Sequence, residues 1–260
     1  MSILKQITDN KQKEIVAAKA LISISDLQQS PFFNRTCHSL KAALLKKGAS
    51  GIIAEFKAAS PSKGLINDVA EPSEVVAGYV SAGASGISVL TDEKFFGGTI
   101  ENLAKARFAA PTTPILRKDF MLDEYQIYEA KAHGADVILL IAECLTKEEI
   151  ATLSAKAHEL GLEVLLELHH NDGVDKISTH VDIVGINNRD LKTFDVDIEA
   201  SINLAECLPK DMLCISESGI ADINTVKRLR TNGFRGFLMG ESFMKEENPG
   251  EACRKFIAEL

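Results

Sequence analysis

The sequence predicts an α/β protein folded as a single (β/α)8 TIM barrel, with residues 1–48 forming an N-terminal helical extension. One reason is length, because 260 residues suit one such barrel, which needs roughly 250. A second is that apolar runs of strand length alternate with helical patterns along the chain. A third is that most of these runs become polar at their C-terminal ends, where active sites of this fold lie. We therefore expect residues 1–260 to form one domain.

Two helical patterns precede the first predicted strand. Apolar residues spaced among charged ones predict an amphipathic helix over residues 1–21. Residues 23–36 are expected to be irregular. Ser39 is placed to cap a second helix that runs through Lys47, and Gly48 would end it. These helices form the extension.

From residue 51 onward the strand and helix patterns recur at intervals typical of a barrel. The predicted strands are residues 51–57, 86–91, 114–119, 136–142, 162–168, 182–187, 212–217 and 235–240. The predicted helices are residues 73–82, 99–109, 122–133, 147–160, 197–206, 221–231 and 250–259, with a short one at 171–177. Such an alternation means parallel strands joined by right-handed crossovers. An open doubly wound sheet is the alternative, because periodicity does not reveal closure.

Composition narrows the functional classes. Hydrophobic residues make up 45% of the chain and charged residues 25%, which suits a globular protein with a large core. The net charge of −8 argues against nonspecific binding to nucleic acid or to anionic membranes, yet it leaves room for an anionic small substrate. The five cysteines form no CxxC pair, which favours free thiols in a reducing cytoplasm. Neither a signal peptide nor an apolar run near the roughly 18 residues of a membrane span is expected.

Charged and amide side chains sit at the ends of six predicted strands, on the same face as core positions. Alternation places Glu55 and Lys57 on the face of Ile53, and the other strands repeat this pattern. The remaining strand-end residues on this face are Lys118, Glu143, Glu167, Asn187, Arg189 and Glu217. A surface ion pair could explain Glu55 and Lys57 alone. Consistent parity on six strands instead predicts one shared site at the mouth of a barrel.

Two stretches resemble phosphate-binding loops. Residues 216–220 follow the seventh predicted strand and residues 239–242 follow the eighth. Small residues there let backbone N–H groups approach an anion, and this is the usual phosphate position in such barrels. Their placement carries more weight than the short Ser-Gly patterns themselves.

Other patterns exclude several chemistries. His169 and His170 are adjacent and would point apart on an extended chain, and no HxxxH or HxH spacing exists, so we expect no metal site. Ser60 and Ser62 lack a nearby His–Asp pattern for acyl transfer. Nucleotide binding has no basis because GxGxxG and P-loop motifs are missing from the sequence. The polar loop at residues 92–94 is equally suited to a lid or to plain solvation.

With these residues assembled, the chain closely resembles the indole-3-glycerol-phosphate synthase family, the ring-closing enzymes of tryptophan biosynthesis. The most specific stretch is IAEFKAASPSK at residues 53–63, which is close to a family signature. The other matching stretches are SVLT at 88–91, FGG at 96–98, LRKDF at 116–120, YQIYEA at 125–130, GINNRDL at 185–191, SESG at 216–219 and FLMGES at 237–242. The predicted N-terminal helical extension also fits the one found in this family.

The resemblance implies a phosphosugar substrate that carries anthranilate. It implies closure of the pyrrole ring with loss of carbon dioxide and water, and no metal or organic cofactor. Lys118 would be the general acid toward the sugar carbonyl, Glu167 would accept or shuttle a proton, and Lys57 would contact the carboxylate. The orienting residues would be Glu55, Asn187 and Glu217. Other enzymes of tryptophan biosynthesis are candidate partners, on which the sequence itself is silent.

The resemblance also implies the substrate contacts. Ser60 and Arg189 would hold the carboxylate side, and Phe96 and Phe120 would wall the aromatic ring. The backbone amides toward phosphate would come from Ser218, Gly219, Gly240 and Glu241.

Two positions depart from the family pattern. His169 and His170 stand where a single His before a small polar residue is more familiar, and Glu241 stands where Ser is common.

Two other functions compete with the synthase. A sister phosphosugar isomerase would use Cys or Asp at the strand ends, but parity places Cys214 toward the helices. A non-catalytic protein that binds phosphorylated metabolites would not require the retained lysines.

Overall fold

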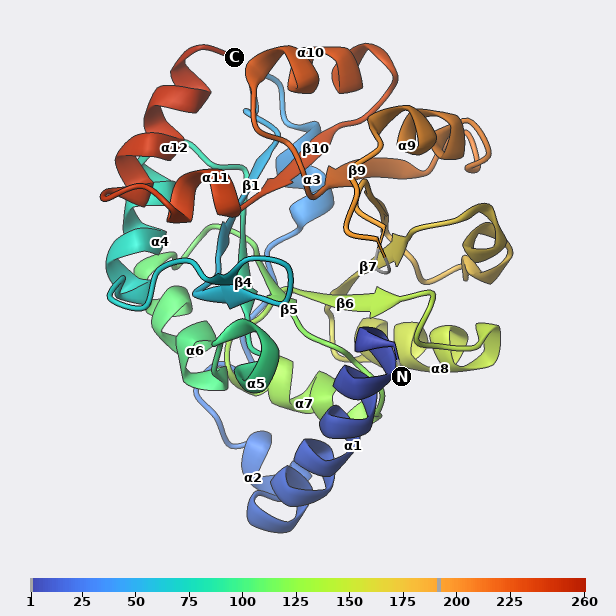
Figure 1. Ribbon diagram of the computed structural model, residues 1–260. Helices are drawn as coiled ribbons and strands as arrows, with labels where there is room; N and C mark the ends of the chain where they lie inside the picture. The colour runs from blue at the N-terminus through green and yellow to red at the C-terminus, as the bar shows by residue number, and fades with distance from the viewer. Residues whose placement is uncertain (1, 191–192) are drawn as a thin grey trace.

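The computed structural model describes residues 2–190 and 193–260, so Met1 of the first predicted helix and Leu191 of the GINNRDL stretch lie outside it. Eight parallel strands form a closed barrel in the order β1-β10-β9-β8-β7-β6-β5-β4. Figure 1 shows the helices encircling these strands. The barrel strands are β1 (Ile52–Phe56), β4 (Gly86–Leu90), β5 (Ile115–Lys118), β6 (Val137–Ile141), β7 (Glu163–Leu168), β8 (Ile183–Asn187), β9 (Leu213–Glu217) and β10 (Gly236–Met239).

Closure of the sheet excludes the open doubly wound alternative. Strand β1 pairs on one side with β10, where Ile53 lies opposite Leu238. On its other side it pairs with β4, where Glu55 lies opposite Ser88. The first strand thus has no free edge, and the predicted barrel is confirmed.

The helices between the strands match the predicted patterns to within about two residues, the usual uncertainty at helix ends. The main ones are α4 (Pro72–Ser81), α6 (Ile100–Ala109), α7 (Glu124–Ala132), α8 (Lys147–Glu159), α9 (Ile198–Ala205), α10 (Ile223–Thr231) and α12 (Pro249–Ala258). The predicted short helix is η1 (Asn171–Lys176), a 3-10 helix. No helix in the described part of the chain is both long and apolar enough to cross a bilayer.

Several short elements were not predicted. A two-stranded hairpin, β2 (Ala59–Ser60) and β3 (Gly64–Leu65), forms within the loop after β1. Helix α2 (Ile24–Leu27) lies in the stretch expected to be irregular, because Ser23 and Asp26 form a capping box. Helix α5 (Glu93–Phe96) is started by the Asp92 side chain, and α11 (Glu241–Met244) follows Gly240. Such single turns depend on caps and carry too little periodicity for prediction.

Side-chain alternation separates two cores. Odd-numbered positions of β1, such as Ile53, face the barrel interior, while Ile52 and Ala54 face the helices. Cys214 lies in the outer layer between strands and helices, as its parity predicts. The interior cluster consists of Leu40, Leu44, Ile53, Leu116, Val137, Leu139, Ile141, Leu165, Ile183, Leu213, Ile215 and Leu238.

The N-terminal extension contacts both ends of the barrel. Helix α3 (Leu40–Leu45) inserts Leu40 and Leu44 into the interior cluster, so it closes the end opposite the mouth. It ends at Leu45, two residues before the predicted end. Helix α1 (Ile3–Leu21) begins at the Ser2 cap and reaches the mouth, where Ile3, Leu4 and Ile7 line a cavity.

A buried ion network ties this extension to the barrel. Asp136, fully buried before β6, accepts hydrogen bonds from the Arg35 guanidinium at 2.6 Å and from the Ile115 backbone N–H at 2.7 Å. The buried Arg107 guanidinium also donates to this carboxylate. Two arginines therefore depend on one carboxylate for their compensating charge.

We expect Asp136→Ala to lower the free energy of unfolding by about 3–5 kcal/mol, because it leaves Arg107 buried without a counter-charge. Urea denaturation followed by circular dichroism measures this. The exposed Asp211→Ala serves as the control and should change stability by less than about 0.5 kcal/mol. A loss below about 1 kcal/mol for Asp136→Ala would contradict the importance of the network.

Candidate active site

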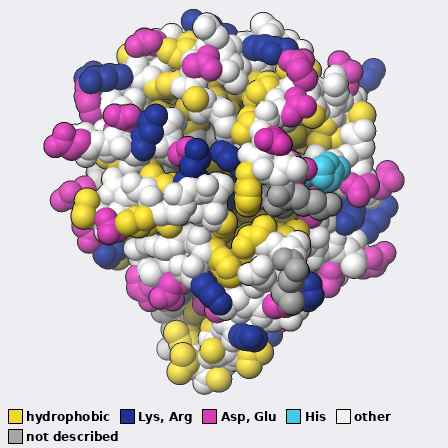
Figure 2. All heavy atoms as spheres, in the orientation of Figure 1, with side chains coloured by type: hydrophobic (Ala, Val, Ile, Leu, Met, Phe, Trp, Pro, Cys, Tyr) yellow, Lys and Arg dark blue, Asp and Glu magenta, His cyan; other side chains and the backbone are white. Residues whose placement is uncertain are grey.

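The C-terminal ends of the strands surround a cavity of about 390 Å³. Figure 2 shows lysine, arginine and acidic side chains gathered around a hollow on this face. With the exception of Glu143, the site residues predicted from sequence all line the cavity. These are Glu55, Lys57, Ser60, Phe96, Lys118, Phe120, Glu167, Asn187, Arg189, Glu217, Ser218, Gly219, Gly240 and Glu241. Their individual roles remain predictions.

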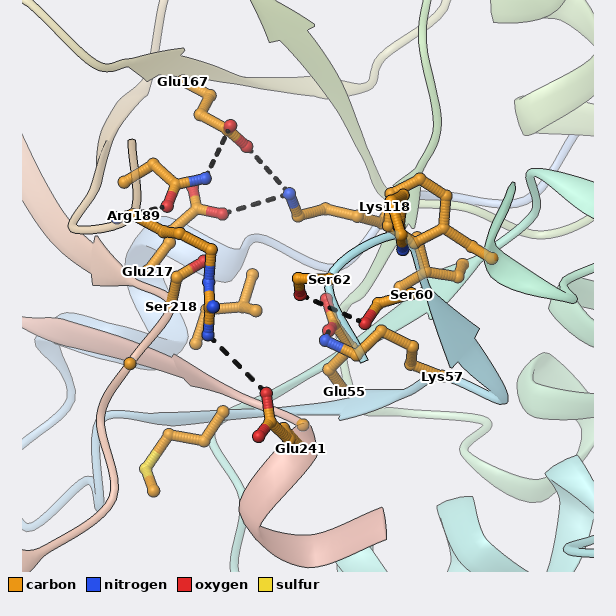
Figure 3. Close-up of a pocket in the computed structure, with 18 of the residues that line it drawn as sticks. Glu55, Lys57, Ser60, Ser62, Lys118, Glu167, Arg189, Glu217, Ser218 and Glu241 are labelled. Atoms are coloured by element: carbon orange, nitrogen blue, oxygen red, sulfur yellow. Dashed lines mark hydrogen bonds and ion pairs between the residues drawn. The ribbon is translucent and has the colours of Figure 1, made fainter. Parts of the chain in front are cut away.

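The Lys118 ammonium lies between two carboxylates. Its Nζ is 2.8 Å from Glu167 Oε2 and 3.2 Å from Glu217 Oε2. The Asn187 amide donates to the other Glu167 oxygen at 3.0 Å. Glu167, Asn187 and Glu217 come from the neighbouring strands β7, β8 and β9, and the curvature of the barrel brings Lys118 to them from β5 (Figure 3). Gly185 makes room for this group, because a Cβ there would lie 2.0 Å from Glu217 Oε1.

A second lysine and carboxylate face this group across the cavity (Figure 3). Lys57 Nζ lies 2.9 Å from Glu55 Oε1, and the Ser88 hydroxyl donates to the other oxygen of Glu55 at 3.2 Å. The cavity therefore presents two ammonium groups, one from the end of β1 and one from β5, which lies two strands away. A substrate with a carbonyl and a carboxylate could contact one at each end.

Burial and neighbouring charges set the protonation of the acidic pair. Burial raises the pKa of Glu167, but the Lys118 ammonium, His169 and the Asn187 hydrogen bond outweigh it and lower that pKa to about 2. Burial is also the main effect on the pKa of Glu217, and it raises that pKa. The Lys118 ammonium lowers the pKa and offsets burial only in part, while repulsion from the Glu167 charge raises it further. The pKa of Glu217 rises to about 7. Neither Glu217 oxygen accepts a well-directed hydrogen bond from the described residues.

Lys118 itself stays protonated near neutral pH. Burial lowers the pKa of its ammonium group, but the charges of Glu167, Glu217 and Glu55 raise it well above its ordinary value. A charged amine beside an ionised carboxylate suits a proton donor. Its usefulness depends on a substrate oxygen that becomes strongly basic during the reaction.

Backbone geometry after β9 and β10 suits an anion. Ser218 and Gly219 adopt positive φ angles of 67° and 68°, and both residues line the cavity. Gly240 is the N-cap of α11, whose first turn also lines the cavity. Glu241 lies 3.6 Å from the Arg189 guanidinium and 3.5 Å from Lys63 Nζ. The Glu241 carboxylate is thus already paired with two cationic side chains, beside the loops that suit an anion.

Apolar side chains cover the remaining walls, and some were missed in the sequence. The ring centroids of Phe96 and Phe120 lie 6.2 Å apart at an angle of 39°, so the two rings contact each other as a tilted aromatic pair. Phe194 lines the cavity as well. So does the N-terminal helix, whose amphipathic pattern gave no sign of which surface its apolar side would meet.

Lys11 anchors that helix and was also missed. Its side chain is only 4% exposed, and its Nζ lies 3.0 Å from Asp92 and 2.9 Å from Asp119. Burial lowers the pKa of Lys11, but Asp119 and Asp92 more than offset this effect. Asp92 therefore contacts α1 and caps α5 from a buried position, whereas Glu93 and Lys94 are exposed in the first turn of α5.

Glu143 is the one strand-end residue that does not line the cavity, which corrects the shared-site prediction for that position. It lies two residues beyond β6, where the chain has already turned, and its carboxylate contacts His169. His169 points inward from the end of β7 and its Nε2 lies 3.4 Å from Glu167 Oε1. His170 is exposed, so the two adjacent histidines do point apart.

We expect Glu217→Gln to become increasingly stabilising, relative to wild type, between about pH 4.5 and 7. In that range the unfolded chain has released the Glu217 proton and the folded protein still binds it. The stability that protonated Glu217 contributes to the wild-type fold is therefore present at low pH and is lost as pH rises through the pKa of Glu217 in the folded protein. Gln does not titrate, so the difference in free energy of unfolding should grow and then level off.

Urea denaturation at several pH values measures this difference. The exposed Glu206→Gln is the control and should give a nearly flat difference across the same range. A flat or falling difference for Glu217→Gln would show that Glu217 is ionised in the fold at acidic pH.

Comparison with known proteins agrees with this geometry. The family model described as indole-3-glycerol phosphate synthase matches residues 4–256. The indole-3-glycerol phosphate synthase of Bacteroides thetaiotaomicron is 51% identical over 255 residues, covering 98% of this chain and 97% of that protein. The one from Salinibacter ruber is 43% identical, covering 100% and 96%.

Solved structures of other enzymes share the fold at low identity. A 3-hexulose-6-phosphate synthase aligns with a TM-score of 0.65 at 14% identity, covering 80% of this chain and 99% of that one. The thiamine phosphate pyrophosphorylase of Pyrococcus furiosus aligns with a TM-score of 0.60 at 15% identity, covering 85% and 98%. These two show the barrel alone. Near-complete matches to the family model and to its members show that the chain belongs to the indole-3-glycerol phosphate synthase family.

Proposed function

We propose a division of roles among the mouth residues for the reaction that this chain catalyses as a member of its family. The chain is a carboxy-lyase of tryptophan biosynthesis. The reaction closes the indole ring of 1-(2-carboxyphenylamino)-1-deoxyribulose 5-phosphate, with loss of carbon dioxide and water. The observation that carries the assignment is the Lys118 ammonium, held between Glu167 and Glu217 in the cavity that Lys57 also lines.

Lys118 is the general acid for ring closure. As the aromatic carbon attacks the sugar carbonyl, negative charge develops on the carbonyl oxygen. An ammonium group fixed by two carboxylates can donate its proton to that oxygen with little reorganisation. Carbon dioxide then departs and leaves its bonding electrons to the ring, which regains aromaticity.

Glu167 serves the later loss of water. The new hydroxyl must be protonated to leave, and a carbon-bound proton must be removed to complete the pyrrole ring. A carboxylate whose pKa is lowered to about 2 is ionised and able to accept this proton. The Asn187 amide and the Lys118 ammonium each hold one of its oxygens, which fixes its direction.

Lys57 contacts the carboxylate of the anthranilate ring and is placed to donate a proton in a later step. Glu55 orients this lysine at 2.9 Å. Ser60 and Arg189 hold the same side of the substrate, and Phe96 and Phe120 wall the ring. Stacking against such rings is compatible with the aromatic half of the substrate.

The phosphate occupies the other end of the cavity. Backbone amides of Ser218, Gly219, Gly240 and Glu241 would approach it, as positive φ angles and a helix start allow. The Glu241 carboxylate would be repelled by phosphate, and its pairing with Arg189 and Lys63 reduces that repulsion. Anchoring both charged ends brings the sugar carbonyl against the ring.

The competing functions fit the geometry less well. Cys214 lies between strands and helices, where burial raises the pKa of its thiol, so it cannot serve an isomerase at this mouth. A protein that only binds phosphorylated metabolites needs no lysine between two carboxylates deep in the cavity, where the desolvation penalty is large.

The wider setting is also a proposal. Free cysteines are consistent with work in a reducing cytoplasm. The enzymes that supply the substrate and consume the product are the candidate protein partners. We take residues 1–260 as one domain, because α1 and α3 pack against opposite ends of the barrel.

We expect Lys118→Ala to lower kcat about 100-fold or more, the scale of a lost general acid, while substrate affinity changes far less. Product formation gives kcat, and calorimetric titration with the substrate gives the affinity. The exposed Lys210→Ala is the matched control and should keep wild-type values. Wild-type turnover in folded Lys118→Ala would remove Lys118 from its assigned role.

A further inference from the structure

The imidazole of His169 is buried beside Glu167 and takes no part in the proposed proton transfers. Its side chain, which directly follows β7, is 3% exposed. Nδ1 lies 2.9 Å from Glu143 Oε2, and Nε2 lies 3.4 Å from Glu167 Oε1. The backbone N–H of His169 also donates to the other Glu143 oxygen at 3.1 Å. The ring is therefore held between two carboxylates, one at each nitrogen.

These two contacts determine the charge of the ring. A neutral imidazole carries a hydrogen on only one nitrogen, and its other nitrogen presents a lone pair. Either neutral tautomer would therefore turn a lone pair toward a carboxylate, whereas the imidazolium form faces both carboxylates with N–H groups. Burial lowers the pKa of His169, but the hydrogen bond to Glu143 and the charges of three nearby glutamates raise it overall. Nε2 makes no well-directed hydrogen bond within the described chain, so its effect on Glu167 is mainly one of charge.

Glu167 loses a counter-charge during the proposed reaction. In the resting site the Lys118 ammonium lies 2.8 Å from Glu167 Oε2. That positive charge disappears once Lys118 has protonated the carbonyl oxygen of the substrate. Glu167 stays buried, and burial favours its neutral form. Glu167 must nevertheless remain ionised until it accepts the carbon-bound proton in the later loss of water.

We propose that His169 is a positioning residue whose positive charge keeps Glu167 ionised after Lys118 has given up its proton. This inference deepens the proposed function, because it rests on Lys118 as the acid and Glu167 as the base. His169 does not line the cavity and acts only through Glu167, without transferring a proton. Glu143 holds the imidazolium in place, which gives a role to the strand-end carboxylate that turns away from the cavity.

The other charged groups around this pair cannot replace His169. The titratable groups that face Glu167 or His169 from the surrounding elements are Lys118, Glu143, Cys144, His170, Lys176 and Glu217. Burial raises the pKa of the Cys144 thiol to about 12, so this group is neutral. His170 is exposed, with its ring centroid 6.4 Å from that of His169, and Lys176 donates to backbone carbonyl oxygens. Once Lys118 is neutral, His169 is the cation that contacts Glu167 among the described residues.

The test measures kcat at saturating substrate from about pH 5.5 to 8.5 in wild type and in His169→Gln. Gln is uncharged at every pH, so Glu167 should become protonated at the acidic end and kcat should fall about tenfold below wild type there. At the alkaline end Glu167 is ionised with or without the imidazolium, and the two values should agree within about twofold. A role in packing alone would lower kcat by the same factor at every pH. The exposed His170→Gln is the matched control and should follow wild type throughout.

Nitrogen NMR of wild-type protein with labelled histidine measures the charge directly, and it carries the test if His169→Gln does not fold. The His169 ring should hold a proton on both nitrogens at about pH 7. A neutral ring at that pH would overturn the proposal, as would a ratio of kcat values that does not change with pH.

Glu167→Gln separates this inference from the proposed function. Turnover retained in folded Glu167→Gln would remove Glu167 from its role as the base. Loss of turnover in Glu167→Gln, together with a flat ratio for His169→Gln, would leave that role standing and overturn only the role of His169.

Discussion

The ammonium group of Lys118 organises the mouth of the barrel, because two carboxylates are buried against it. Removing charged groups from water is expensive, and one lysine cannot fully compensate two glutamates. Glu167 keeps its charge with help from Asn187 and His169, whereas Glu217 is pushed toward its neutral form. The site thus holds a charged ammonium group, an ionised carboxylate and a carboxyl group that titrates near neutrality, all within a few ångströms. Such separation of protonation states is what a sequence of proton transfers requires.

The barrel separates this charged mouth from the apolar structure that holds it. The same inward face of each strand is apolar below and polar at its C-terminal end, so Leu116 packs the interior while Lys118 lines the cavity. Backbone hydrogen bonds on both sides of every strand fix the spacing of these ends. The extension strengthens both regions, since α3 fills the closed end and α1 is fixed to the mouth through Lys11.

The proposed phosphate end is the more general part of the site. Amides at positive φ and a helix start after the last two strands can bind an anion without recruiting a charged side chain. Barrels with other chemistries share this fold at 14% or 15% identity. What distinguishes this mouth is its pair of lysines, with Lys57 held by Glu55 from β1 and Lys118 held by carboxylates from β7 and β9. Specific chemistry therefore resides in a few strand ends and not in the barrel as such.

Local pattern in the sequence determined the strand and helix positions, because periods of two and 3.6 residues are properties of neighbouring residues. It also determined which side chains share the inward face, from Glu55 to Glu217, and the resemblance assigned them roles. Closure, the extra caps and the cavity contacts of α1 were decided by the tertiary structure. So were the burial of Lys11 and the turn of Glu143 toward His169. These features depend on contacts between residues far apart in the chain, and on desolvation that no local pattern records.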